Sequence, residues 1–133
     1  MDALVVLAKN IAYYAHAGQF RRDGTPYFMH PLRISEKCTR VDFKVVALLH
    51  DVLEDTSETS ISLVEKGIPE ELVQVVELLS KSQHKSYSQY LKSIKQNNMA
   101  LEVKKFDMLD NMCDNPTQKQ LLKYSKALVY LFG

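Results

Sequence analysis

The sequence predicts an all-α fold, a compact bundle of about eight helices. Apolar residues recur every three to four positions through most of the chain, as expected for helices with one buried face. No stretch of strand length alternates apolar and polar residues, and the connections between helical segments are short. The 133 residues are enough for a core without disulfide bonds or a structural metal ion, so we expect a single domain over residues 1–133.

The N-terminal part of the chain is expected to contain two helices separated by a polar loop. The first helix runs up to a break at Gly18. It is indicated by apolar residues at helical spacing, namely Val5, Val6, Ile11, Ala12 and Ala15. The loop over residues 19–27 contains a glycine and a proline, which prevent the helix from continuing. Pro31 then fits the first turn of the second helix.

Capping signals divide the rest of the chain into shorter helices. Asp42 is expected to be the N-cap of a third helix over about residues 43–53. Thr59 is expected to cap a short helix that ends at Gly67. The remaining helices are expected over residues 69–79, 87–96 and 100–112, and after a capping box formed by Thr117 and Gln120.

Composition narrows the possible partners and the cellular compartment. Seventeen basic residues nearly balance sixteen acidic ones, so no overall field favours a nucleic acid polymer or a membrane surface as partner. No apolar run approaches the roughly 20 residues of a membrane span. Cys38 and Cys113 are too few for a disulfide framework, and residues 1–7 lack the features of a signal peptide. We expect a cytoplasmic protein, as a monomer or a homodimer.

The segment of residues 45–55 carries the strongest chemical signal. Apolar pairs alternate with polar pairs, so helical geometry gathers His50, Asp51, Glu54 and Asp55 on one side. This spacing lets adjacent turns present metal ligands beside a further carboxylate. Taken alone, the segment is equally compatible with a solvated acidic face that includes one histidine.

Three other segments add to this signal. His30 stands at a loop-to-helix junction, Arg21 and Arg22 occupy the loop before it, and residues 107–111 place two aspartates and an asparagine on one helical face. The chain contains, in order, A-H-x-G-Q, R-R-x-G-x-P-Y, H-P, L-L-H-D-V-L-E-D-T and K-x-x-D-x-x-x-N. From Ala15 to about residue 131, it resembles the HD-domain hydrolases of the RelA/SpoT type, which remove the 3′-pyrophosphate from guanosine alarmones.

The resemblance implies a divalent metal site and an acidic catalytic pair. The matching metal ligands are His30, His50, Asp51 and Asp107. Two imidazoles and two carboxylates suit Mn²⁺, and Zn²⁺ would also accept these atoms. The family's usual preference for manganese favours the former. Glu54 and Asp55 match the pair that orients the attacking water and moves its proton.

By the same resemblance, Arg21, Arg22 and Asn111 match residues that bind the nucleotide. Guanidinium groups suit this task, because they stack on bases and make forked contacts to phosphate oxygens. The resemblance gives no ligand role to three other polar or aromatic residues. We interpret His16 as a supporting histidine and Tyr27 as a packing residue, and leave Asp110 as either facing the site or on the surface.

Two departures from the family pattern keep the substrate open. In the long alarmone hydrolases the last motif reads K-L-A-D-R-L-H-N-M, whereas here Met108 replaces the arginine and Asp110 the histidine. The segment resembles short, single-domain relatives more closely. With no room for a synthetase domain, we expect hydrolysis of (p)ppGpp to GDP or GTP and pyrophosphate. The alternatives are another nucleotide substrate, such as an adenosine alarmone or a nucleotide monophosphate, and a catalytically silent nucleotide-binding module.

Overall fold

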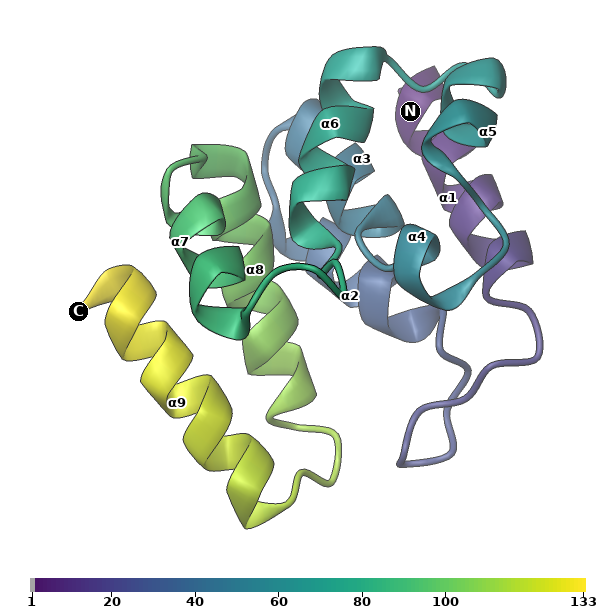
Figure 1. Cartoon of the computed structure of the whole chain (residues 1–133). Helices are drawn as coiled ribbons and strands as arrows, with labels where there is room; N and C mark the ends of the chain where they lie inside the picture. Colours follow the sequence, from purple (N-terminus) through teal and green to yellow (C-terminus); the bar gives the residue numbers. More distant parts are fainter. Residues whose placement is uncertain (1) are drawn as a thin grey trace.

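Nine helices and no strand make up residues 2–133, the part of the chain that the computed structural model describes (Figure 1). The helices are α1 (Ala3–Ala15), α2 (Met29–Lys37), α3 (Val41–Leu49), α4 (Val52–Asp55), α5 (Ser60–Glu65), α6 (Glu70–Leu79), α7 (Tyr87–Lys95), α8 (Asn98–Asn111) and α9 (Gln118–Phe132). The loop between α1 and α2 closes with one isolated bridge between Phe20 and Pro26. The predicted all-α class is confirmed.

Local side-chain chemistry sets several helix starts. Thr59 and Thr117 each form a capping box, at the first turns of α5 and α9, so both predictions of a cap are confirmed. Gly67 follows α5 with φ of 109°, a conformation that favours glycine. Asp2 is the N-cap of α1: its carboxylate accepts hydrogen bonds from the backbone N–H groups of residues 4 and 5.

The predicted third helix is wrong in its limits. The helix begins at Val41 with Arg40 as N-cap. Asp42 lies in its first turn, where the negative carboxylate interacts favourably with the unpaired N–H groups of the helix start. It also ends early, because Asp51 adopts φ of −104° and ψ of −5° between α3 and α4. Glu54 therefore stands on the separate, four-residue helix α4 and not on a continuous face with His50.

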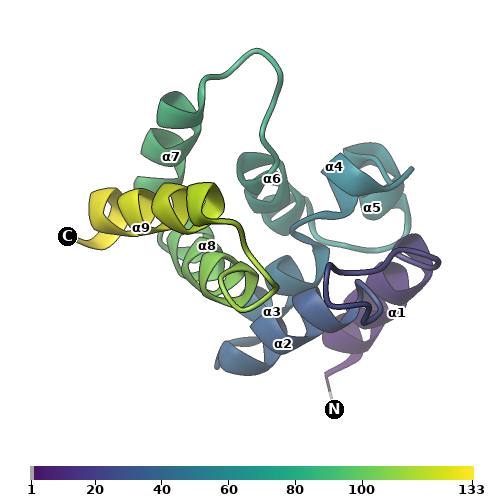
Figure 2. The ribbon, with the colours of Figure 1, turned by 90° about the horizontal axis from the view of Figure 1, so that it is seen from below.

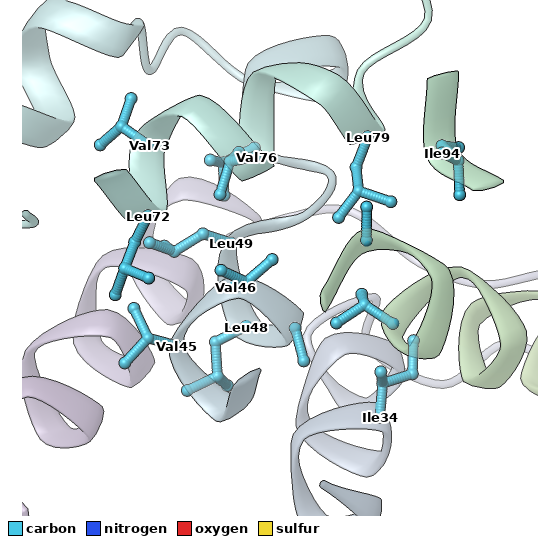
Figure 3. Close-up of a cluster of buried hydrophobic side chains, with 14 of the residues drawn as sticks. Ile34, Val45, Val46, Leu48, Leu49, Leu72, Val73, Val76, Leu79 and Ile94 are labelled. Carbon is cyan, nitrogen blue, oxygen red and sulfur yellow. The ribbon is translucent and has the colours of Figure 1, made fainter. Parts of the chain in front are cut away.

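Helix α3 lies at the centre of the core. Its last five residues, Val45–Leu49, are fully buried, and it packs against α1, α2, α6 and α8. Figure 3 shows Val46 and Leu49 beneath Val76 of α6, in the middle of this cluster. Each fully buried side chain of this size contributes about 1.5–3 kcal/mol to folding. The core thus fixes the end of α3, from which His50 extends.

The C-terminal helices cover one side of the molecule. Helix α9 packs on α7 and α8, away from α1 and α5 at the opposite side (Figures 1 and 2). Helix α8 reaches back to α2 and α3, so it connects both halves. Within residues 2–133, no helix combines the length and apolar character that crossing a membrane would require.

Candidate metal centre

Four side chains from three parts of the chain meet near the middle of the molecule. His30 comes from the first turn of α2, His50 and Asp51 from the junction of α3 and α4, and Asp107 from α8. One nitrogen or oxygen atom from each lies within 4.8 Å of the other three. The two histidines and Asp107 are buried, and the Asp51 side chain is 17% exposed.

Both imidazoles point Nε2 at the carboxylates. His30 Nε2 lies 2.9 Å from Asp107 Oδ1 and 3.6 Å from Asp51 Oδ2. His50 Nε2 lies 3.0 Å from Asp51 Oδ2 and 3.3 Å from Asp107 Oδ1. Two nitrogen and two oxygen donors converge on one point, and this donor set suits a divalent first-row ion. The residues present therefore fit a bound metal ion.

The outer nitrogen of each imidazole is held by an acceptor. His50 Nδ1 donates to the carbonyl oxygen of Ala47 at 2.6 Å, and His30 Nδ1 donates to Asp110 Oδ2 at 2.7 Å. A carbonyl or an ionised carboxylate only accepts, so the neutral imidazole keeps its proton on Nδ1. The lone pair of each Nε2 is then free for a metal ion, an arrangement typical of protein metal sites.

The two aspartates are held in the same way. The hydroxyl of Tyr27 donates to Asp51 Oδ2 at 2.5 Å. Lys104 Nζ donates to Asp107 Oδ2 at 3.0 Å, and Asn111 Nδ2 donates to Asp107 Oδ1 at 3.1 Å. Such outer partners orient ligating carboxylates and limit the positions that they can adopt.

Neighbouring positive charges keep the two aspartates of the cluster ionised, the form that binds a cation. Burial raises the pKa of Asp107, but the neighbouring Lys104 and His50 hold it well below its usual value. Burial likewise raises the pKa of Asp51, but the charge of His50 brings it down to about 2. Burial lowers the pKa of His50, but both aspartates raise it well above normal. A metal ion would replace the imidazole proton as the balancing positive charge.

The predicted catalytic pair lies on α4, outside the cluster of four candidate ligands. Glu54 and Asp55 are exposed and line an open cavity of about 530 Å³ together with residues 80–82. Partial burial of the carboxylate raises the pKa of Glu54, and a hydrogen bond from the backbone N–H of Lys81 to that carboxylate partly offsets the shift. Partial burial, and then the charge of Asp51, raises the pKa of Asp55. A raised pKa suits a carboxylate that exchanges protons near neutral pH.

The three residues predicted to bind the nucleotide lie in two different environments. Arg22 is exposed and donates to Gln120 of α9, and together with Asn111 and Tyr124 it borders a cavity of about 100 Å³. The Arg21 side chain is only 2% exposed and points inward, where its Nη2 donates to Asn111 Oδ1 at 3.4 Å. The structure therefore brings Arg22 and Asn111 to one cavity and places Arg21 behind them.

Sequence reasoning missed the contacts of two residues. Asp110 is buried and bonded to His30, whereas the sequence left its direction open. Tyr27, interpreted from the sequence as a packing residue, lies beside His16 and His30, with ring centroids 4.8 and 5.6 Å away, and its hydroxyl also donates to Asp51. The position of Asp110 one helical turn after Asp107 was the available signal.

His16 is buried beside Tyr27 and is not one of the four clustered residues. Its Nδ1 lies 2.9 Å from Gln19 Oε1, and its buried Nε2 has no hydrogen-bond partner among the described residues. Burial lowers the pKa of His16, which favours the neutral imidazole. Gln19 also donates to the carbonyl oxygen of Asp55 at 2.8 Å, so the loop after α1 is tied to α4.

The all-α fold and this cluster define a helical protein with a buried site of two histidines and two aspartates in metal-binding geometry. The chain belongs to the HD domain family, whose model matches residues 8–120.

Among its relatives are two bacterial proteins named guanosine-3′,5′-bis(diphosphate) 3′-pyrophosphohydrolase. The one from Borreliella burgdorferi is 38% identical over 78 residues, which are 56% of this chain and 12% of the relative. The one from Aquifex aeolicus is 28% identical over 117 residues, which are 79% of this chain and 17% of the relative. The chain thus spans less than a fifth of the length of these curated relatives.

A solved structure matches the fold along the whole chain. It is described as a metazoan ortholog of SpoT that hydrolyzes ppGpp, and it superposes with a TM-score of 0.81 at 23% identity. The match covers 100% of this chain and 88% of that one. At this identity the likeness establishes the shared helical fold.

Proposed function

We propose that residues 1–133 act as one cytoplasmic, metal-dependent phosphohydrolase domain that removes the 3′-pyrophosphate of guanosine alarmones. The products would be GDP or GTP and pyrophosphate. One observation carries the proposal: four ligand atoms from α2, the α3–α4 junction and α8 lie within 4.8 Å of one another. Similarity to the 3′-pyrophosphohydrolases supports the choice of substrate.

In this proposal His30, His50, Asp51 and Asp107 hold one Mn²⁺ ion. Nitrogen and carboxylate donors suit Mn²⁺, and Zn²⁺ is the alternative that the same atoms accept. When bound, the ion supplies Lewis-acid activation for the attack of water on phosphorus.

Glu54 and Asp55 are the proposed proton carriers. Both carboxylates stand on α4, three and four residues after the proposed ligand Asp51, and border one cavity. The pKa of each is raised, first of all by partial burial. One of them would accept a proton from the attacking water, and the pair would deliver one to the leaving oxygen.

Arg22 and Asn111 are the proposed direct contacts to the nucleotide. They border the same small cavity, where a guanidinium and an amide offer several donors to phosphate and sugar oxygens. Arg21 belongs to the proposed substrate set through Asn111, whose amide oxygen its Nη2 holds.

The decisive test replaces one ligand. Asp51→Asn should lower the Mn²⁺-dependent turnover of ppGpp by more than about 100-fold, because even the loss of an outer partner of a ligand costs 10–100-fold. The far-ultraviolet circular dichroism should remain that of a helical protein. His84→Asn, at an exposed histidine in the loop before α7, serves as the control with wild-type turnover. Full activity of Asp51→Asn would rule out this site.

Met108 favours one other substrate class. It is fully buried where the long relatives carry an arginine, so this chain lacks that positive charge beside Asp107. A panel of 3′- and 5′-phosphorylated guanosine and adenosine nucleotides, assayed with Mn²⁺, distinguishes (p)ppGpp from another nucleotide as the substrate. Fastest turnover of an adenosine nucleotide or of a monophosphate would move the assignment to that nucleotide. Tight binding of ppGpp without turnover would make the chain a silent binding module.

A further inference from the structure

A second layer of charged residues lies behind His30, and two of its members, Asp110 and Arg33, have no part in the function proposed above. Asp110 lies one turn after Asp107 on α8, and its Oδ2 accepts a hydrogen bond from His30 Nδ1 at 2.7 Å. Arg33 of α2 grips the same carboxylate with two bonds, Nε to Oδ1 at 2.8 Å and Nη2 to Oδ2 at 3.1 Å. Arg21 Nη2 lies 3.3 Å from Oδ2.

We propose that Asp110, clamped by Arg33 and Arg21, is a positioning residue that fixes His30 as a metal ligand through Nε2. This inference rests on the metal centre of the proposed function. It also gives Arg21 a place in the site that does not require direct contact with the nucleotide.

The clamp leaves Asp110 little freedom. A forked guanidinium contact fixes the plane of a carboxylate as well as its position. Both Asp110 oxygens are occupied, and its side chain is only 8% exposed. Arg33 and Arg21 place two positive charges beside the carboxylate of Asp110. Arg21 also faces a second carboxylate, because its Nε lies 3.4 Å from Asp114 Oδ2. The carboxylate of Asp110 is therefore held in its ionised, accepting form.

The consequence falls on the imidazole of His30. An ionised carboxylate cannot donate, so His30 Nδ1 must carry the proton in the neutral ring. The lone pair on Nε2 then faces Asp107 Oδ1 and Asp51 Oδ2 in the cluster. Without Asp110, the ring could carry its proton on Nε2 and donate to Asp107, which would block the metal position.

His50 provides an internal comparison. Its Nδ1 is held by the neutral carbonyl oxygen of Ala47, a weaker partner than a carboxylate. His30 also belongs to α2, whereas His50 stands at the end of the central core helix α3. The more strongly held imidazole is thus the one on a helix outside the centre of the core.

A purely structural role would make Asp110 only a tie between α2 and α8. That role predicts lower stability after substitution, with no change in the protonation of His30. Two readouts separate the possibilities, namely the affinity of the metal-free protein for Mn²⁺ and the ¹⁵N shifts of the His30 ring with Zn²⁺ bound, since Zn²⁺ is diamagnetic.

The test compares Asp110→Asn with Asp114→Asn by calorimetric titration with Mn²⁺. Asp110→Asn should raise the Kd for Mn²⁺ by about 10–100-fold, the usual cost of losing an outer partner of a ligand. Asp114→Asn removes a carboxylate that faces the same arginine but does not contact His30, and it should leave the Kd unchanged. In the wild type, ¹⁵N spectra should show His30 protonated at Nδ1, and in Asp110→Asn this preference should weaken.

An unchanged Kd and an unchanged His30 spectrum in folded Asp110→Asn would overturn the inference and leave the proposed function standing. A wild type that binds no Mn²⁺ would overturn both. If Asp110→Asn does not fold, Arg33→Gln loosens the clamp at a side chain that is 38% exposed, and a raised Kd is again expected. The wild-type spectrum decides as well, because His30 protonated at Nε2 with Zn²⁺ bound contradicts the proposal.

Discussion

Tyr27 links the loop before α2 to the metal-binding cluster through one hydroxyl group. Its hydrogen bond to Asp51 Oδ2 is 2.5 Å long, and its ring packs against His16 and His30. The hydroxyl orients the proposed ligand Asp51, whereas the ring contributes to packing. A substitution that removes only the hydroxyl therefore separates the two contributions.

Tyr27→Phe should raise the Kd for Mn²⁺ by about tenfold, the lower end of the range for outer partners of ligands. The free energy of unfolding should fall by about 1 kcal/mol, the typical net value of one hydrogen bond. Titration calorimetry and urea denaturation measure these two effects. Tyr13→Phe, at a half-exposed tyrosine packed on Phe28, should change neither. A wild-type Kd in Tyr27→Phe would make Tyr27 a packing residue only.

At the scale of single residues, sequence separation decides what could be predicted. His50 and Asp51 are adjacent, so their proximity needed no tertiary information. Asp110 and His30 are 80 positions apart, and their contact depends on the packing of α8 against α2. Helical periodicity places Asp110 on the same face as Asp107 but does not say which helix that face meets. The motif resemblance supplied the grouping of the four ligands, and the ligand roles remain predictions.

At the scale of helices, local chemistry predicted the starts of α5 and α9, but it gave the wrong start and the wrong end for α3. Thr59 and Thr117 were found because capping boxes involve only neighbouring residues. The same signal occurs at Ser86 and Gln89, where α7 begins. The break after α3 was missed because apolar periodicity continues across it. At the break, Asp51 contacts His50, its neighbour in sequence, and Tyr27, which is 24 positions away and whose contact no local pattern indicates.

The capping box of α9 matters for the candidate site, because α9 brings Gln120 and Tyr124 to the cavity beside Arg22. Thr117→Ala should lower the free energy of unfolding by about 1 kcal/mol, the usual cost of losing such a cap. Urea denaturation followed by circular dichroism measures the change. Ser125→Ala, on the exposed face of α9, is the matched control and should not destabilise the protein, because alanine is the better helix former. Equal stability of Thr117→Ala and the wild type would show that α9 is held by packing alone.

At the scale of the whole molecule, the cluster joins helices that lie far apart in the chain. A metal ion held by His30, His50, Asp51 and Asp107 would link α2, the α3–α4 junction and α8 at one point. These segments already pack together, since α8 contacts both α2 and α3. The unfolded chain cannot offer the four ligands in this arrangement, so the ion would bind the folded state preferentially. Metal binding and folding are therefore expected to be coupled.

This coupling predicts a large effect of metal removal on thermal stability. With free Mn²⁺ at 100 times its Kd, the folded state should gain about 2.7 kcal/mol over the metal-free protein. For a chain of this size, that gain corresponds to a rise in Tm of roughly 10 °C. Thermal unfolding in EDTA and in excess Mn²⁺, followed by circular dichroism, measures the shift. Asp51→Asn should lose most of the shift because it removes a proposed ligand, whereas His84→Asn should keep it. An equal shift in the wild type and Asp51→Asn would mean that Mn²⁺ stabilises the protein at some other place.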